Sequence, residues 1–272
     1  MEESIVGIIG GTGVTNLPGL VVKYDTCPLT PYGYPSARIR IGVWQGARVA
    51  FIERHGTKHS IPPHKVPYKA NLAALKSLGV RHVVATCVVG SLREDLNPGT
   101  FVIPNQFIDQ TWGRDDTFSV DKRLIHLPMA EPYCKTCSRA AADALRNIIV
   151  PVRSDVTVVV IQGPRFSTIA EGRMYAQWGG DVINMTQYPE CYFARELGLC
   201  YTAIGSITDY NPGVSDGPTM TSIGTPEFED VLVVFRQNTN KTILALRQLM
   251  LNHASFVGCR CAEISTRHYY EE

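Results

Sequence analysis

Short apolar runs that end directly in polar, glycine-containing segments constrain the fold of this chain more than any other feature of its sequence. Residues 5–9 run into the glycine-rich residues 10–13, and residues 156–161 end in the same way. Apolar runs of this length, bounded by glycine or proline, are typical of buried strands. Stretches with helical spacing alternate with them, as in residues 68–78, which stop at Gly79. This alternation predicts an α/β fold.

The rest of the chain repeats this organisation. Further strands are predicted at residues 37–43, 47–53, 82–88, 181–185 and 201–208, and further helices at residues 135–148, 190–197 and 228–251. Residues 212–226 are rich in Gly, Pro, Ser and Thr and are predicted to form a mobile loop. No repeat, low-complexity block or linker divides the chain. We therefore expect one domain over residues 1–272, with a core of about 5–251, a C-terminal tail of 252–272 and a largely internal sheet.

Charge and hydropathy argue against two classes of partner. The 26 Lys and Arg residues balance the 25 Asp and Glu residues, for a net charge of +1, so the basic excess expected of a nucleic-acid binder is missing. No stretch of about 18 apolar residues is present, so we expect no membrane span. The acidic N-terminus lacks the pattern of a signal peptide. A cytoplasmic location is therefore expected.

The eight cysteines suggest neither a metal site nor a disulfide framework. Cys134 and Cys137 have CxxC spacing, but no second CxxC or His pair follows at a zinc-like distance. His55 and His59 precede Ile61, Pro62 and Pro63, so they are not expected to share a helix face, and a metal is not expected at His55, His59 and His64 either. The CxC pair at residues 259–261 is either a strained redox pair or without function. In the absence of a signal peptide, we expect reduced thiols, no metal and no cofactor.

Six polar segments follow predicted strands, at residues 10–13, 54–59, 87–91 and 163–167, at Thr186 and at Asp209. In open α/β sheets, ligands bind at the carboxyl ends of the strands. The six strand ends therefore predict one composite small-molecule site.

The residue types in these segments favour an anionic ligand. The glycine-rich segment has Asn16 where a dinucleotide fingerprint needs its third glycine, so a bare phosphate suits the segment better. Arg54 offers a fork of donors that matches phosphate oxygens, and His55 can add a further bond. Asp209 is placed to donate a proton or to anchor a substrate. Each segment taken alone is also compatible with an ordinary turn.

Taken in order, these segments resemble the 5′-methylthioadenosine phosphorylase branch of the purine nucleoside phosphorylases. The matching blocks are IIGGTG at 8–13, RHG at 54–56, HKVPYKAN at 64–71, GSL at 90–92, HLPMAEP at 126–132, GPRFST at 163–168, NMT at 184–186 and TDY at 208–210. The resemblance covers about residues 5–251. It implies an α/β fold, a single domain with a central mixed β-sheet, partly barrel-like, flanked by α-helices.

The resemblance also implies a pentosyltransferase reaction and its site. Phosphate and a purine nucleoside, most closely 5′-methylthioadenosine, would give adenine and 5-methylthioribose 1-phosphate, with phosphate as co-substrate and no cofactor. Phosphate would be held by Thr12, Arg54, His55, Thr186 and the backbone of Cys87 and Val88. Met185 would lie beneath the ribose, Phe166 and Ser167 would line the base pocket, and Asp209 would hold the proton at purine N7. His126 would reach the site of a neighbouring subunit in a homo-oligomer, a trimer or a dimer of trimers.

Four positions depart from the family pattern. Cys87 and Val88 replace the usual Thr and Ala, and Phe228 replaces a smaller aliphatic residue beside the 5′ pocket. Asn211 stands where an Asp usually accepts a hydrogen bond from the adenine amino group. An amide can serve either a 6-amino or a 6-oxo group. The alternative is therefore a phosphorylase of broader or 6-oxopurine specificity, acting on inosine, guanosine or methylthioinosine. The remaining alternative is a non-catalytic nucleotide-binding or regulatory protein with this fold.

Overall fold

The computed structural model describes residues 5–118, 126–214, 226–256 and 258–266. Its strands are β1 Ile5–Gly10, β2 Val21–Thr26, β3 Ile39–Trp44, β4 Ala47–Glu53, β5 Val80–Ser91, β6 Phe101–Gln110, β7 Val152–Ile161, β8 Val182–Asn184 and β9 Cys200–Tyr210. Its helices are α1 Tyr68–Ser77, α2 Lys135–Asn147, α3 Ile169–Gln177, α4 Gln187–Glu196, α5 Pro226–Leu251 and α6 Cys261–Thr266. Short 3₁₀ turns span Thr57–His59, Pro63–Lys65 and His253–Phe256.

The nine strands form one mixed sheet that closes partly on itself. The strand order is β2-β3-β4-β1-β5-β8-β7-β6-β9, and β9 pairs again with β5. Strands β5, β8, β7, β6 and β9 thus form a closed ring, from which β1, β4, β3 and β2 extend as an open sheet. The pairs β1–β4, β1–β5, β5–β9, β6–β7 and β7–β8 are parallel, whereas β2–β3, β3–β4, β5–β8 and β6–β9 are antiparallel. The predicted mixed, partly barrel-like sheet is confirmed.

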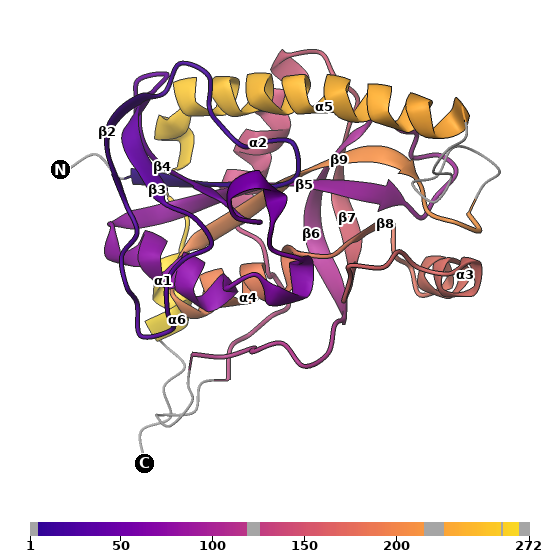
Figure 1. Ribbon diagram of the computed structural model, residues 1–272, viewed down its shortest axis with the longest axis horizontal. Helices are drawn as coiled ribbons and strands as arrows, with labels where there is room; N and C mark the ends of the chain where they lie inside the picture. The colour runs from indigo at the N-terminus through magenta and orange to yellow at the C-terminus, as the bar shows by residue number, and fades with distance from the viewer. Residues whose placement is uncertain (1–4, 119–125, 215–225, 257, 267–272) are drawn as a thin grey trace.

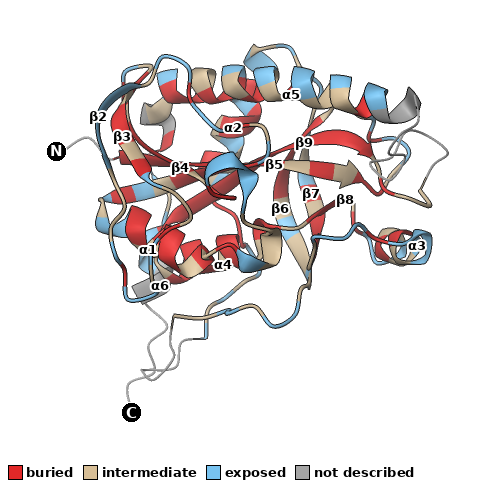
Figure 2. Cartoon of the chain, in the orientation of Figure 1, coloured by how far each residue is buried: buried red, intermediate tan, exposed pale blue. Residues whose placement is uncertain are grey.

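Helices cover both faces of the open sheet (Figure 1). Helices α2 and α5 lie on one face, and α1 and α4 lie on the other. Successive side chains of a strand point to opposite faces. In β1, Val6 and Ile8 accordingly pack into the core beneath α2 and α5, whereas Ile5 and Ile9 pack into the core beneath α1 and α4. This two-sided burial, visible as red ribbon along the central strands in Figure 2, explains why β1 is apolar throughout.

Two strands, β2 and β6, were not predicted. All of β2 is exposed or half-buried, and Lys23 and Asp25 interrupt its apolar residues, so no buried run marks it. In β6, Pro104 is followed by two polar residues, and the register with β7 shifts at that point. All the predicted strands and helices are present. Their ends differ from the predicted ones by up to four residues, as in β7, which begins at Val152.

The C-terminal part of the chain packs onto the core beyond residue 251. Phe256 and Cys261 are buried in the same apolar cluster as α2 and α5. Most of the loop predicted at residues 212–226 lies outside the described residues. Among the helices that the structure describes, none is both long and apolar enough to cross a bilayer.

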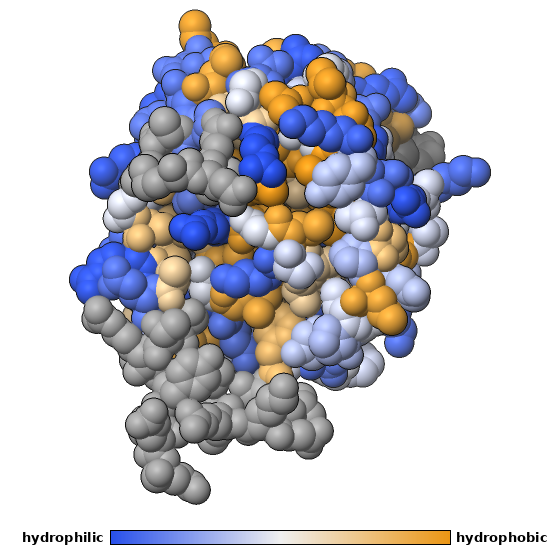
Figure 3. Space-filling model, turned by 90° about the vertical axis from the view of Figure 1, so that its left-hand side faces the viewer, coloured by the Kyte–Doolittle hydropathy of each residue, from blue (hydrophilic) through white to orange (hydrophobic). Residues whose placement is uncertain are grey.

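The sheet has a free edge at β2. Val21, Val22 and Tyr24 on this strand are 68%, 46% and 53% exposed. Figure 3 views the molecule from the side on which β2 lies and shows apolar side chains gathered in patches between hydrophilic ones. An exposed edge strand with apolar side chains is a surface at which another chain can pack.

Candidate active site

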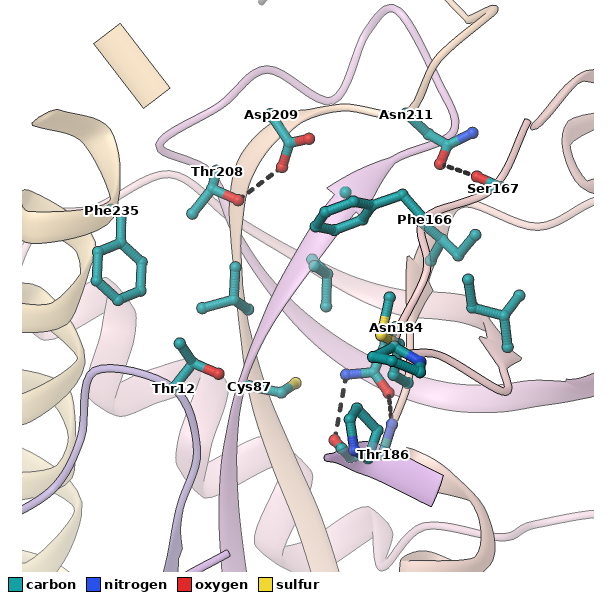
Figure 4. A pocket seen from close by; sticks show the side chains of 18 of the residues that line it. Thr12, Cys87, Phe166, Ser167, Asn184, Thr186, Thr208, Asp209, Asn211 and Phe235 are labelled. Atoms are coloured by element: carbon teal, nitrogen blue, oxygen red, sulfur yellow. Dashed lines mark hydrogen bonds between the residues drawn. The ribbon is translucent and has the colours of Figure 1, made fainter. Parts of the chain in front are cut away.

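A cavity of about 340 Å³ opens at the carboxyl ends of the strands. All six polar segments that the sequence singled out contribute to its wall. Of the predicted site residues, Thr12, Arg54, His55, Cys87, Val88, Phe166, Ser167, Met185, Thr186, Asp209 and Asn211 line it. His126 is exposed and does not line this cavity. In Figure 4, Thr12, Cys87 and Thr186 lie at one end, and Asp209 and Asn211 lie at the other.

Arg54 is held by a buried ion pair that the sequence did not reveal. Its Nε and Nη2 donate to Glu190 Oε2 and Oε1 at 2.6 and 2.8 Å, and its Nη1 donates to the Thr86 carbonyl at 2.8 Å. Arg54 is 1% exposed and Glu190 0%. Burial by itself would lower the pKa of Arg54, but the Glu190 carboxylate outweighs burial and raises it. The guanidinium therefore stays charged, and two of its five N–H groups remain for a ligand.

The glycine-rich turn after β1 presses against this arginine. A Cβ atom on Gly11 would lie 2.7 Å from Arg54 Nη1 and 2.2 Å from the Thr86 carbonyl oxygen. The Gly11 amide donates to Thr86 Oγ1 at 2.9 Å, which fixes the turn to β5. The absence of a side chain at Gly11 therefore places Thr12 in the same cavity as Arg54.

His55 is neutral and has a defined tautomer. Burial, followed by the charge of Arg54, lowers its pKa to about 4. Its Nδ1 lies 2.9 Å from the Ile61 carbonyl oxygen. Because a carbonyl oxygen only accepts, Nδ1 carries the proton and Nε2 is left as an acceptor.

Thr186 is oriented by a turn at the N-terminus of α4. Its amide donates to Asn184 Oδ1 at 2.7 Å, and Asn184 Nδ2 lies 3.5 Å from its hydroxyl oxygen. Thr186 is the N-cap residue of α4 but makes no capping bond with its side chain. Among the described residues, its hydroxyl hydrogen has no acceptor, so the hydroxyl can donate into the cavity.

The thiol of Cys87 faces the protein. Its Sγ accepts from Gln187 Nε2 at 3.1 Å and donates to the Ile204 carbonyl at 3.8 Å. Burial raises the pKa of Cys87 to about 11, so the thiol is neutral. A neutral thiol beside Arg54 adds no negative charge that would repel an anion.

At the other end of the cavity, Asp209 and Asn211 follow the buried part of β9. Asp209 is 6% exposed, and its Oδ1 accepts from the Thr208 hydroxyl at 2.7 Å. Ser167 Oγ donates to Asn211 Oδ1 at 2.5 Å (Figure 4). Asn211 Nδ2 donates to the Pro212 carbonyl at 3.2 Å. Flipping the amide would set its oxygen against the Pro212 carbonyl oxygen. The Asn211 side chain therefore presents Oδ1 on the side of Ser167.

Phe235 and Glu190 were not predicted from the sequence, whereas His59 belongs to the predicted polar segment 54–59. Phe235 reaches the cavity from α5, and His59 stacks on His55 with ring centroids 4.4 Å apart. Phe235 is one residue among many in an amphipathic helix, so nothing local distinguishes it. Glu190 is marked in the sequence only as a single acid in an otherwise uncharged stretch of α4. Phe228, predicted beside the 5′ pocket, lies in α5, and its side chain is outside the described residues.

The fold and the composite site together define a phosphorylase-type enzyme architecture. Residues 5–248 match the Phosphorylase superfamily, and the chain belongs to this family. It is 47% identical over 234 residues to the S-methyl-5′-thioadenosine phosphorylase of Mycolicibacterium smegmatis, covering 86% of this chain and 85% of that protein. It is 42% identical to the enzyme of the same name from Pyrococcus furiosus, covering 95% and 96%.

Solved structures agree with this assignment. The S12T mutant of adenosine/methylthioadenosine phosphorylase from Schistosoma mansoni in complex with adenine superimposes with a TM-score of 0.88 at 32% identity, covering 98% of this chain and 99% of that one. The same variant in complex with methylthioadenosine superimposes with a TM-score of 0.86 at 34% identity, covering 97% and 96%.

Proposed function

We propose that the chain catalyses the phosphorolysis of 5′-methylthioadenosine to adenine and 5-methylthioribose 1-phosphate. One observation carries the proposal: a buried, charged Arg54 with unused donors and a carboxyl group, Asp209, line the same 340 Å³ cavity from two different strand ends. A cavity of this size suits a small nucleoside. The names of the relatives and the methylthioadenosine in one solved structure support this substrate class.

The Arg54 end provides the chemistry for phosphate. The two free N–H groups of Arg54 and the hydroxyls of Thr12 and Thr186 donate to anionic oxygens. His55 Nε2 instead accepts, and it therefore suits the protonated oxygen of hydrogen phosphate, HPO₄²⁻. The backbone of Cys87 and Val88 closes the site. Because the groups are fixed before phosphate arrives, little reorganisation is needed to bind it.

The Asp209 end provides the chemistry for the departing base. Cleavage of the glycosidic bond leaves positive charge on the ribose ring and negative charge on the purine. Phosphate on one side of C1′ stabilises the first, and a proton held by Asp209 at purine N7 neutralises the second. Met185 packs beneath the ribose, and Phe166 flanks the base. Catalysis thus consists mainly of positioning and electrostatics.

The fixed amide of Asn211 favours a 6-aminopurine. Its Oδ1 has a second lone pair, and the Ser167 oxygen also keeps acceptor capacity. Both accept from an exocyclic amino group, whereas a 6-oxo group would need a donor. The alternative is a phosphorylase that takes inosine, guanosine or methylthioinosine. In that case the second N–H of the Asn211 amide, which does not donate to the Pro212 carbonyl, would donate to the 6-oxo group.

We also propose a cytoplasmic homo-oligomer that needs no cofactor beyond its co-substrate phosphate. A trimer or a dimer of trimers would bring His126 of one subunit to the 5′ end of a neighbour's cavity. The exposed apolar side chains on β2 supply surface for association. Gel filtration with light scattering measures the number of subunits, and a monomer would contradict this part of the proposal.

The decisive experiment is phosphate-dependent release of free base from methylthioadenosine, adenosine, inosine, guanosine and methylthioinosine. We expect methylthioadenosine to be preferred and release to stop when phosphate is omitted. Preference for the 6-oxopurines would support the alternative. No release from any nucleoside, with nucleoside binding retained in calorimetry, would refute an enzymatic function.

A further inference from the structure

A cluster of thiols lies outside the cavity, where three distant segments meet. The Sγ atoms of Cys134, Cys200, Cys259 and Cys261 all lie within 4.8 Å of one another. Cys134 is the N-cap residue of α2, Cys200 begins β9, and the other two follow α5. Three of the four are buried, and Cys259 is half-buried. The ligand spacing that appears incomplete in the sequence is completed by the fold.

The four sulfur atoms have the size of a tetrahedral thiolate site. Zinc–sulfur bonds of about 2.3 Å place the four sulfurs of a tetrahedron about 3.8 Å apart. The Sγ atoms of Cys200 and Cys259 are 2.8 Å apart, and this pair would open by about 1 Å around a metal. Cys259 lies on a short connecting segment between α5 and α6. A shift of this size therefore does not disturb a helix or a strand.

A buried arginine lies beside the cluster and favours negative charge on the sulfur atoms. Arg195 is 6% exposed, and its Nη1 lies 4.0 Å from Cys261 Sγ. Among the described residues, its Nε has no hydrogen-bond partner. A buried guanidinium is costly without a counter-charge. Neutral thiols or disulfides would not supply one, whereas four thiolates around Zn²⁺ carry a net charge of −2.

We propose that Cys134, Cys200, Cys259 and Cys261 bind one structural Zn²⁺ ion. Binding deprotonates the four thiols and releases the protons to solvent. Four protein ligands leave no open position, as is usual for a structural site. The site joins the segment after α5 to α2 and to the start of β9.

The site is remote from the cavity. Cys200 and Asp209 lie at opposite ends of β9, nine residues and therefore about 30 Å apart along the strand. The metal is accordingly expected to stabilise the fold without taking part in the reaction. The inference does not depend on the proposed function.

The test is the metal content of the full-length protein, purified under reducing conditions and without chelators. We expect elemental mass spectrometry to find about one zinc ion per chain. After exchange for Co²⁺, we expect the visible absorption of a tetrahedral cobalt–thiolate centre. Neither measurement requires a variant. A chain that binds neither metal, or one in which peptide mapping finds Cys200 joined to Cys259 by a disulfide, would overturn the proposal.

Variants locate the ligands. In Cys200→Ser and Cys261→Ser, zinc should fall at least about tenfold and the melting temperature should drop, while kcat/KM at 25 °C stays near that of the wild type. Cys191→Ser is the matched control, because Cys191 is equally buried but lies outside the cluster, and it should keep its zinc. Full zinc retention in the Cys200→Ser, Cys261→Ser double variant would exclude this ligand set.

Discussion

Replacing the carboxylate that holds Arg54 tests whether the cavity is built around a pre-positioned charge. Glu190→Gln keeps the shape of the side chain but removes its charge. Glu190 accepts three hydrogen bonds, two from Arg54 and one from Tyr201 at 2.7 Å. The amide of Gln offers only one oxygen, so at least one of these donors would face an N–H group. The Arg54 charge would then be buried without a partner.

The size of the effect follows from this burial. Removing one partner of a fully buried ion pair costs about 3–5 kcal/mol. A folded chain of this length unfolds with an entropy of about 0.6 kcal/mol/K, so a loss of about 3 kcal/mol lowers the melting temperature by about 5 °C. Phosphate, bound against Arg54, would replace the missing negative charge. It should therefore raise the melting temperature of Glu190→Gln more than that of the wild type.

Differential scanning calorimetry with and without phosphate measures both quantities. Asp25→Asn serves as the control, because it removes the carboxylate of an exposed arginine pair, with side chains 62% and 49% exposed, and should leave the melting temperature unchanged. If Glu190→Gln melts within about 1 °C of the wild type, as an ordinary surface substitution does, the ion pair does not position Arg54 and the reasoning fails.

Four further predictions concern the cavity. Asp209→Asn should lower kcat by about 10²–10⁴-fold while nucleoside affinity, measured by calorimetry, changes little; normal turnover would remove Asp209 as the proton donor. Asn211→Asp should raise the kcat/KM ratio of methylthioadenosine over methylthioinosine about fivefold, because an ionised acceptor binds an amino group more strongly, and an unchanged ratio would exclude this residue from base selection. Gly11→Ala should raise the KM for phosphate, since its Cβ would collide with Thr86 and Arg54; a normal KM would show that the turn can move. The pKa of His55 is lowered from 6.5 to about 4, so below pH 6.5 the unfolded chain binds a proton that the folded chain does not, and stability is lost as the pH falls towards 4. In His55→Gln the pH dependence of the unfolding free energy between pH 6.5 and 4.5 should be shallower by up to about 1.4 kcal/mol per pH unit, and an unchanged slope in urea titrations would contradict the assigned protonation state.

The sequence by itself determined the elements that are buried on both sides and the ends at which they carry polar residues. Strands such as β1 must be apolar throughout because helices cover both faces of the sheet. A continuous run of apolar residues therefore marks the position of such a strand in the sequence. Strands β4, β1, β5 and β9 are mutually parallel, so the polar residues directly after them gather at one edge of the sheet. This part of the composite site could therefore be predicted without knowing how the strands are ordered, whereas Thr186 follows β8, which is antiparallel to β5, and reaches the site through the tertiary structure. The fold class followed from the same alternation.

Only the tertiary structure decided which groups face one another. Glu190 meets Arg54 across 136 positions of sequence, and the carbonyls of Ile61 and Pro212 fix the His55 tautomer and the Asn211 amide. Strand β2 is held by pairing with β3 although its own side chains are mostly exposed. The thiol cluster likewise forms where three distant segments meet. Local sequence patterns indicate whether a residue is buried, but they do not indicate which residue it contacts. Contacts between residues far apart in sequence depend on how the strands and helices are connected and ordered in the fold.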